Sequence, residues 1–173
     1  MTRILLLSGL AAIFLIATPA AAQISMSRSP ATSPVIGTVV RGNAATTFSV
    51  STAGVVTRVS GDAIRLSSAS ITQPTVTLTC GTNSNCQNRD VRVTVTASGA
   101  SGAGSITRFR VGSLTGATYR TAAPADAASL AFDLMPLGSR GSATFTLGMD
   151  VLLAAAANSG ADTFTFTVTA TFL

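Results

Sequence analysis

The stretch TFTFTVTATFL, Thr163 to Leu173, alternates strictly between threonines and apolar residues up to Phe172. A strand points successive side chains to opposite faces, so this stretch predicts a strand with one apolar face and one hydroxyl face. Thr and Phe both favour strands. No residues follow Leu173 in this sequence to form a neighbouring strand. We therefore expect another segment or another chain to pair with the outer edge of this strand.

The first 22 residues are predicted to be a secretion signal. Arg3 precedes an apolar run from Ile4 to Ile16, and Thr18 to Ala22 supply a cleavage pattern that leaves Gln23 first. A retained membrane anchor is the alternative, but the run is short for a span of about 20 residues. We therefore predict that the chain is exported. The remaining chain, about 150 residues, is long enough for one domain with a core.

The composition limits the class of protein. All eleven positive residues are Arg and all six acidic residues are Asp, while Lys, Glu, His and Trp are absent. Charged residues make up 10% of the chain, far below the usual share of about a quarter. This composition fits an exported protein with a hydroxyl-rich surface and argues against a cytosolic enzyme or a nucleic-acid binder. Because the helix formers Glu and Lys are absent, few helices are expected.

Most of the chain is predicted to form short strands separated by turn residues. Residues 23–34 (QISMSRSPATSP) are expected to be an extended, poorly ordered arm, because prolines and serines interrupt them. Residues 35–173 are expected to form one domain, an antiparallel sandwich or barrel. Strands are predicted at residues 35–41, 48–50, 54–59, 64–66, 75–80, 91–97, 109–111, 130–134, 145–149 and 163–173, and either a helical turn or a loop at 121–128.

The two cysteines are predicted to form a disulfide. The alternating runs Thr75–Cys80 and Val91–Ala97 are joined by CGTNSNCQNRD, which predicts a hairpin with a long loop. Cys80 and Cys86 both lie in this loop, and paired cysteines are typical of exported proteins. So short a closed loop contributes only about 2 kcal/mol. A metal site is the alternative, but no His or second Cys pair completes it, so we predict no metal and no cofactor.

Catalytic groups are scarce. Without His, Lys or Glu the chain has no Ser–His–Asp triad and no Ser–Lys dyad. An Asp pair among Asp126, Asp133 and Asp150, acting on a glycosidic bond, is the remaining catalytic alternative. We favour the interpretation that these residues stabilise turns and keep the surface soluble, and predict that the protein is not an enzyme.

Several arginines lie on predicted strands, opposite apolar positions. We favour a solvated sheet face that protects the strand edges. A shallow face that binds acidic glycans is the alternative. These residues are Arg58, Arg65, Arg92, Arg108 and Arg110.

The C-terminus resembles that of chaperone–usher pilus subunits. Those subunits typically carry a penultimate aromatic residue and a Gly fourteen residues from the end, with alternating apolar residues between them. Here Phe172 is penultimate and Gly160 is the fourteenth residue counted back from Leu173. Residues 48–66, and those from 145 onward, also resemble spore-coat-U and fimbrial-type secreted sandwiches of bacteria. The intervening alternation consists of Phe164, Phe166, Val168 and Ala170.

The resemblance implies an all-β, antiparallel immunoglobulin-like β-sandwich of about eight to ten short strands that lacks its final strand. An assembly groove would then lie beside the C-terminal strand. Its residues would be Gly160, Phe164, Phe166, Val168, Ala170 and Phe172. A strand donated by another chain would fill it, first from a periplasmic chaperone at an outer-membrane usher and then from the next subunit. Repetition of this contact gives an open fibre. The donor would lie within Gln23 to Val40, with candidate residues Ile24, Met26, Val35, Gly37 and Val39.

The main prediction is therefore a structural subunit of a bacterial surface fibre or coat, whose partners are copies of itself or related subunits. A small outer-membrane β-barrel is one alternative. The seven Phe and one Tyr that follow residue 22 are few for two aromatic girdles, and most predicted strands are shorter than a membrane span requires. A monomeric secreted glycan-binding or adhesin module, with the groove closed by its own arm, is the other.

Overall fold

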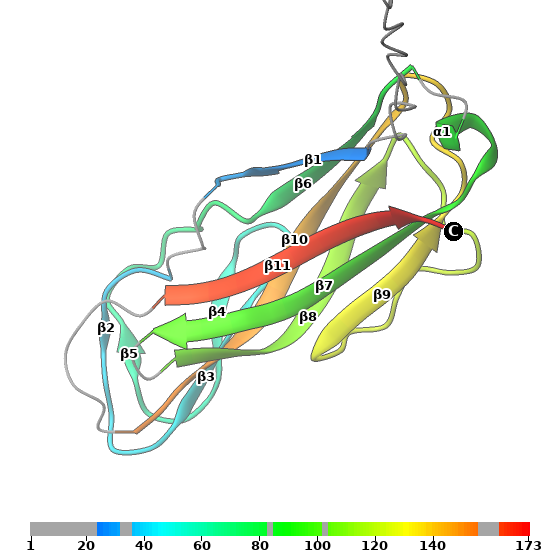
Figure 1. Cartoon of the computed structure of the whole chain (residues 1–173). Coiled ribbons are helices and arrows are strands. Elements are labelled where there is room, and N and C mark those ends of the chain that lie inside the picture. Colours follow the sequence, from blue (N-terminus) through cyan, green and yellow to red (C-terminus); the bar gives the residue numbers. More distant parts are fainter. Residues whose placement is uncertain (1–23, 32–35, 83–84, 102–103, 156–162) are drawn as a thin grey trace, which may run out of the picture.

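The computed structural model describes residues 24–31, 36–82, 85–101, 104–155 and 163–173. This part of the chain is almost entirely β-structure (Figure 1). No helix within the described ranges is long and apolar enough to cross a membrane. The elements are β1 (Ile24–Ser29), β2 (Val39–Val40), β3 (Thr46–Val50), β4 (Val56–Ser60), β5 (Ile64–Arg65), β6 (Thr75–Cys80), α1 (Asn85–Asn88), β7 (Val91–Ser101), β8 (Gly104–Thr115), β9 (Ser129–Leu134), β10 (Ser142–Leu153) and β11 (Thr163–Phe172).

Strand β10 connects the strands of the larger layer. Its first half pairs with β6 and its second half with β3, while β8 pairs along its opposite edge. Strand β1 lies outside β6, and β4 lies outside β3. All of these pairings are antiparallel. The result is a six-stranded sheet in the order β1-β6-β10-β3-β4, with β8 beside β10.

The smaller layer contains three strands in the order β11-β7-β9, and β2 and β5 form a separate two-stranded ribbon. The order β1-β6-β10-β8 and the pair β7-β11 correspond to strands A-B-E-D and C-F of an immunoglobulin-like sandwich. In the complete fold a final strand lies along the outer edge of strand F. No described strand pairs with that edge of β11. The all-β, antiparallel immunoglobulin-like β-sandwich is thus confirmed, with eleven strands among the described residues where about eight to ten were expected, and with β7, β8 and β10 longer than expected.

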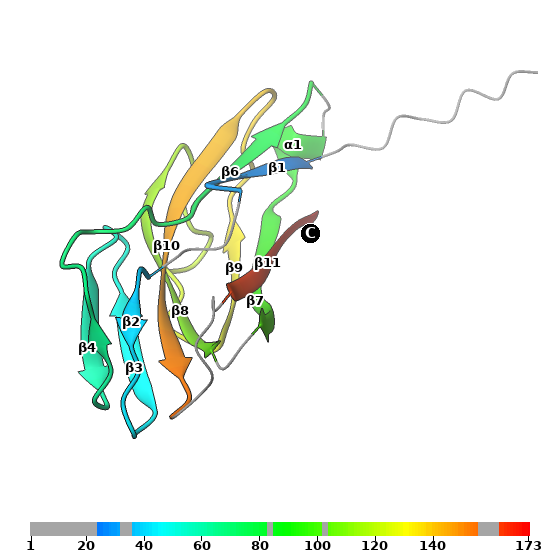
Figure 2. The ribbon, with the colours of Figure 1, turned by 90° about the vertical axis from the view of Figure 1, so that its left-hand side faces the viewer.

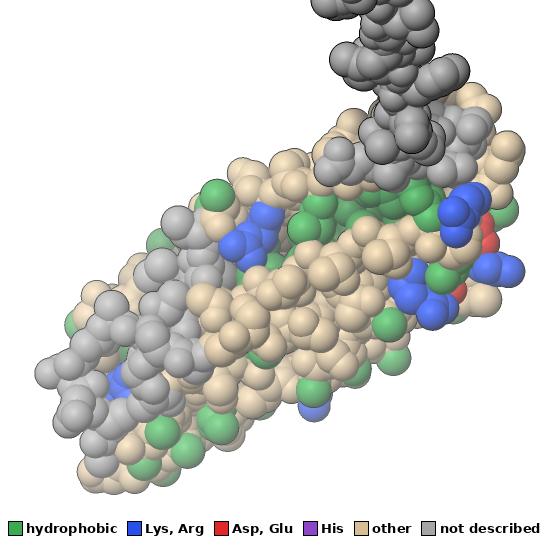
Figure 3. Space-filling view, viewed as in Figure 1, with side chains coloured by type: hydrophobic (Ala, Val, Ile, Leu, Met, Phe, Trp, Pro, Cys, Tyr) green, Lys and Arg blue, Asp and Glu red, His purple; other side chains and the backbone are tan. Residues whose placement is uncertain are grey.

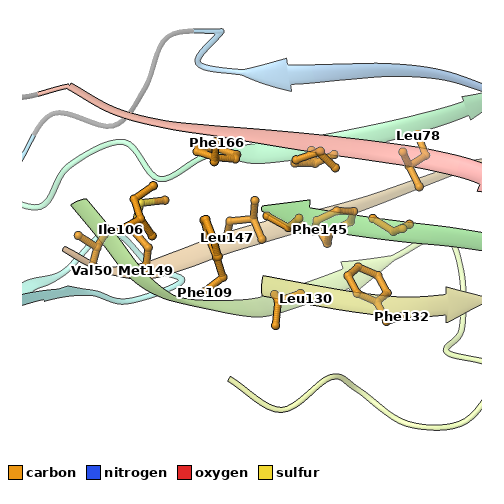
Figure 4. Packing of buried hydrophobic residues seen from close by; sticks show 14 of the residues in the cluster. Val50, Leu78, Ile106, Phe109, Leu130, Phe132, Phe145, Leu147, Met149 and Phe166 are labelled. Atoms are coloured by element: carbon orange, nitrogen blue, oxygen red, sulfur yellow. The ribbon is translucent and has the colours of Figure 1, made fainter. Parts of the chain in front are cut away.

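The core lies between the two layers, which are seen edge-on in Figure 2 and in close-up in Figure 4. Phe145 and Leu147 of β10 are fully buried against residues of the facing layer. The rings of Phe132 and Phe145 meet edge-to-face at 5.5 Å, and those of Phe109 and Phe166 at 5.9 Å, a favourable arrangement for aromatic pairs. The alternation seen in the sequence therefore marks the side chains that fill the sandwich.

The predicted hairpin between residues 75–80 and 91–97 is wrong. Strand β6 pairs with β1 and β10, whereas β7 pairs with β11 and β9. The connection between them crosses from one layer to the other and contains α1. Alternation predicts that a strand has an apolar face, but it does not specify the strand's hydrogen-bonded neighbour. Here the two apolar faces belong to opposite layers.

Two local expectations also need correction. Residues 24–29, expected to be part of a poorly ordered arm, form β1 and pair with β6 from Ile24↔Cys80 to Ser29↔Thr75. Backbone hydrogen bonds do not depend on apolar side chains, so serines and an arginine are accommodated in an outer strand. Of the two alternatives for residues 121–128, the loop is found and the helical turn is not, and Ala127 forms a bridge to Phe109.

Candidate assembly groove

The C-terminal strand β11 has one paired edge and one open edge. It pairs with β7 along its whole length, from Thr163↔Ser101 to Phe172↔Val91. Among the described strands none pairs with its other edge. The side chains of Phe166 and Val168 point into the sandwich and are only 5% and 6% exposed. The open edge therefore presents backbone donors and acceptors beside a buried apolar face.

One hydrogen bond identifies which backbone groups face the open edge. Arg28 Nη1, on β1, donates to the carbonyl oxygen of Phe166 at 3.1 Å. Since backbone groups of successive residues in an antiparallel strand point to opposite sides, Val168 and Ala170 direct theirs the same way as Phe166. On the paired side, the N–H of Leu173 donates to the carbonyl of Asp90 at 2.9 Å, which fits this alternation.

A groove of about 320 Å³ lies between β1 and β11. Figure 3 shows hydrophobic atoms exposed in a strip between these two strands, with positively charged atoms beside it. Several lining residues also belong to the core, so the groove is a place where the core reaches the surface. The groove is lined by Met26, Arg28, Ala31, Val76, Phe166, Thr167 and Val168.

The opposite wall of the groove is β1. Met26 on this strand is 42% exposed, high for a large apolar side chain next to a core. Strand β1 is the outermost strand of its layer, just as β11 is of the other layer. Both layers therefore end in an outer strand on the same flank of the sandwich.

Two arginines contact aromatic residues of β11 in a similar way. The guanidinium carbon of Arg28 lies 4.5 Å from the centre of the Phe166 ring, and Arg28 Nη2 also donates to the carbonyl of Ala31 at 2.6 Å. The guanidinium carbon of Arg89 lies 5.6 Å from the centre of the Phe172 ring. Arg89 Nε donates to the carbonyl of Leu173 at 2.7 Å. Arg28 acts from the open edge of β11, whereas Arg89 acts at the paired side.

The structure places the predicted groove residues differently. Phe166 and Val168 line the groove. Phe164 is buried in the core and does not line it, and Ala170 and Phe172 are partly buried farther along β11. Gly160 lies outside the described residues.

The candidate donor residues have places within this chain. Ile24 and Met26 lie on β1, and Val39 pairs with Arg65 in the β2–β5 ribbon. Gly37 has φ +91°, a left-handed conformation that glycine adopts readily and a strand does not use. Val35 lies outside the described residues. A donor role for any of these residues stays a prediction.

The predicted disulfide between Cys80 and Cys86 is confirmed. Both residues are buried. Cys80 ends β6 and pairs with Ile24, the first residue of β1, while the carbonyl of Cys86 accepts a hydrogen bond from the N–H of Gly138 at 2.9 Å. The bond therefore fixes the layer-crossing connection close to the start of β1.

The three acidic residues considered for glycosidic chemistry are paired with arginines. Asp133 binds Arg92, and Asp126 and Asp150 both bind Arg110. Arg108 also lies 3.6 Å from Asp150. Three of the five strand arginines considered for glycan binding, namely Arg92, Arg108 and Arg110, are therefore paired with carboxylates. No group of three or more potential metal ligands occurs among the residues that the structure describes.

Arg58 and Arg65 lie elsewhere, in a second depression of about 540 Å³ beside the β2–β5 ribbon. Their guanidinium groups donate to backbone carbonyls: Arg58 to Ala63 at 3.0 Å, and Arg65 to Ile36 and Ala69. These five predicted strand arginines therefore do not form one continuous face.

The sequence did not identify the four groove-lining residues that lie outside β11, which are Met26, Arg28, Ala31 and Val76. Arg28, Ala31 and Val76 were given no role in the groove. Met26 was considered only as a donor. The alternation of Ile24, Met26 and Arg28 was the available signal, since it predicts a strand whose side chains share one face. No family model, curated protein or solved structure matches this chain.

Proposed function

We propose that this protein is a structural subunit of a bacterial surface fibre or coat, assembled by β-strand addition along β11. The observation that carries the proposal is a groove lined by the core residues Val76, Phe166 and Val168, next to an edge of β11 with which no described strand pairs. The occupant is an extended segment of another copy or of a related subunit. By resemblance, a periplasmic chaperone and an outer-membrane usher would act before assembly.

The chemistry of the groove suits strand addition. Backbone groups of Phe166, Val168 and Ala170 on the open edge would provide hydrogen bonds that are independent of the partner's sequence. The apolar lining would select a segment with apolar residues at alternate positions. Contact of a strand on one subunit with a groove on the next is heterologous, so repetition produces a fibre rather than a closed pair.

The test removes one open-edge N–H. Ala170→Pro eliminates an N–H that points away from β7, and proline is tolerated on an outer strand when its nitrogen faces outward. Ala170→Ser, at the same position, retains the N–H and is the matched control. Each variant is produced in the native cell, and material sheared from the surface is run on SDS gels without heating, alongside thermal unfolding of the purified chain.

The proposal predicts SDS-resistant ladders for the wild type and for Ala170→Ser, and monomer for Ala170→Pro with its unfolding midpoint within about 4 °C of wild type. Ladders from Ala170→Pro equal to those of the wild type would show that the open edge is not used. A wild type that is monomeric in the sheared fraction, in the periplasm and in the medium would overturn the assembly function altogether.

A further inference from the structure

We infer that Arg28 is a gate on the assembly groove, whose side chain must leave the edge of β11 before a strand can be added. This inference rests on the proposed function and concerns its regulation. Arg28 lies on β1, on the wall opposite β11, and its side chain crosses the groove to Phe166.

The contact occupies two features that an incoming strand needs. The hydrogen bond from Arg28 Nη1 uses the outward carbonyl of Phe166, which is a backbone acceptor for an added strand. The guanidinium also lies over the Phe166 ring, 4.5 Å from its centre, and so covers apolar surface that the partner would bury. A charged donor makes this hydrogen bond stronger than one between neutral groups.

The remaining contact keeps the guanidinium in place. Arg28 Nη2 donates to the carbonyl of Ala31 at 2.6 Å, so the side chain is held by its own loop as well as by β11. Arginine suits this role because its planar group can stack on a ring and donate in two directions at once. An outer strand edge that is blocked by a charge is protected from premature pairing. The gate therefore slows assembly until a partner strand displaces it.

The experiment compares the assembly rate of the purified full chain with Arg28→Met, which keeps an apolar stem but removes the donors and the charge. Arg89→Met is the matched control, because it removes a similar ring contact and a backbone hydrogen bond at the paired side of β11. Both are repeated with Ser27→Cys and Thr77→Cys together. These two residues face each other across β1 and β6, so a disulfide between them keeps β1 from leaving its sheet.

We expect Arg28→Met to form SDS-resistant ladders about tenfold faster than the wild type, with or without the β1–β6 crosslink, and Arg89→Met to match the wild type. Equal rates for Arg28→Met and the wild type overturn the gate while leaving strand addition intact. Ladders that form in the crosslinked chains at the same rate with Arg28 and with Arg28→Met also overturn it, because release of β1 would then explain the faster assembly without the crosslink. Absence of ladders in every variant overturns both the gate and the proposed function.

Discussion

Arg92 on β7 and Asp133 on β9 stand directly opposite each other in the smaller layer and form a two-pronged ion pair. Arg92 Nε lies 2.8 Å from Asp133 Oδ1, and Arg92 Nη2 lies 2.9 Å from Oδ2. Planar guanidinium and carboxylate groups match in this geometry. The hydrogen bond from Arg92 lowers the pKa of Asp133, and the charges of Arg92 and Arg120 lower it further against the opposing effect of desolvation.

This pair predicts a pH-dependent contribution to stability. A carboxyl whose pKa is lower in the folded than in the unfolded chain stabilises the fold above its unfolded pKa of about 3.9, and the contribution is lost as pH falls through the folded pKa. We expect Asp133→Asn to be less stable than the wild type in urea at pH 7, with a smaller difference at about pH 2. A difference of the same size at both pH values would contradict the assignment.

A second prediction concerns two arginines that contact the same carboxylate. Arg110 donates to Asp150, Asp126 and Ser49, and its side chain is 20% exposed, whereas that of Arg108 is 55% exposed and 3.6 Å from Asp150. Arg110→Met should lower the free energy of unfolding by about 2 kcal/mol, because the buried carboxylate of Asp150 then loses its hydrogen bond from Arg110. Arg108→Met should cost less than about 1 kcal/mol. Chemical denaturation measures both, and similar losses would show that burial of the pair is unimportant.

Two glycines with the same backbone conformation allow strain to be separated from crowding. Gly116 and Gly138 have φ values of +74° and +78°. A Cβ at Gly138 would meet no atom within 4 Å, whereas a Cβ at Gly116 would lie 2.2 Å from the carbonyl oxygen of Ser142. Gly138→Ala should therefore cost about 1–2 kcal/mol from backbone strain alone. Gly116→Ala should cost about 3 kcal/mol or more, since β10 must shift. Equal losses in urea unfolding would contradict the crowding at Gly116.

The disulfide predicts an effect of reductant on stability. Opening the Cys80–Cys86 bond frees a short loop in the unfolded chain. The free energy of unfolding of the reduced protein should therefore be about 2 kcal/mol lower than that of the oxidised protein. Guanidinium unfolding with and without a phosphine reductant measures this difference, with thiol titration to verify reduction. An unchanged midpoint in fully reduced protein would show that the bond has no stabilising role.

Alternation in the sequence predicted the strands that bury a regular apolar face. Strands β3, β6, β9 and β11 lie where the patterns place them, because every second residue meets the facing layer. Strand β1 was missed because Ser25, Ser27 and Arg28 give an outer strand no continuous apolar stripe. The placement of β6 and β7 in opposite layers was missed because paired strands and facing strands show the same alternation.

The candidate site was predicted on one side only. Phe166 and Val168 were assigned to the groove from the C-terminal pattern, and they line it. Its other wall depends on β1, about 140 residues earlier in the chain, and no local pattern predicts a contact over that separation. Arg28 and Phe166 lie in different layers, so their contact forms only when the two layers pack against each other. Sequence alone therefore identified the strand that offers an edge, but not the side chain that covers it.

The multiple pairing of β10 has a consequence for how this sequence can vary. Because β10 is hydrogen-bonded to β6, β3 and β8 at once, gain or loss of a single residue near its centre would put part of three ladders out of register and turn Phe145 or Met149 toward solvent. No single neighbour can compensate for such a change. Length variation in natural variants of this protein should therefore collect in the connections between strands and be absent from residues 142–153.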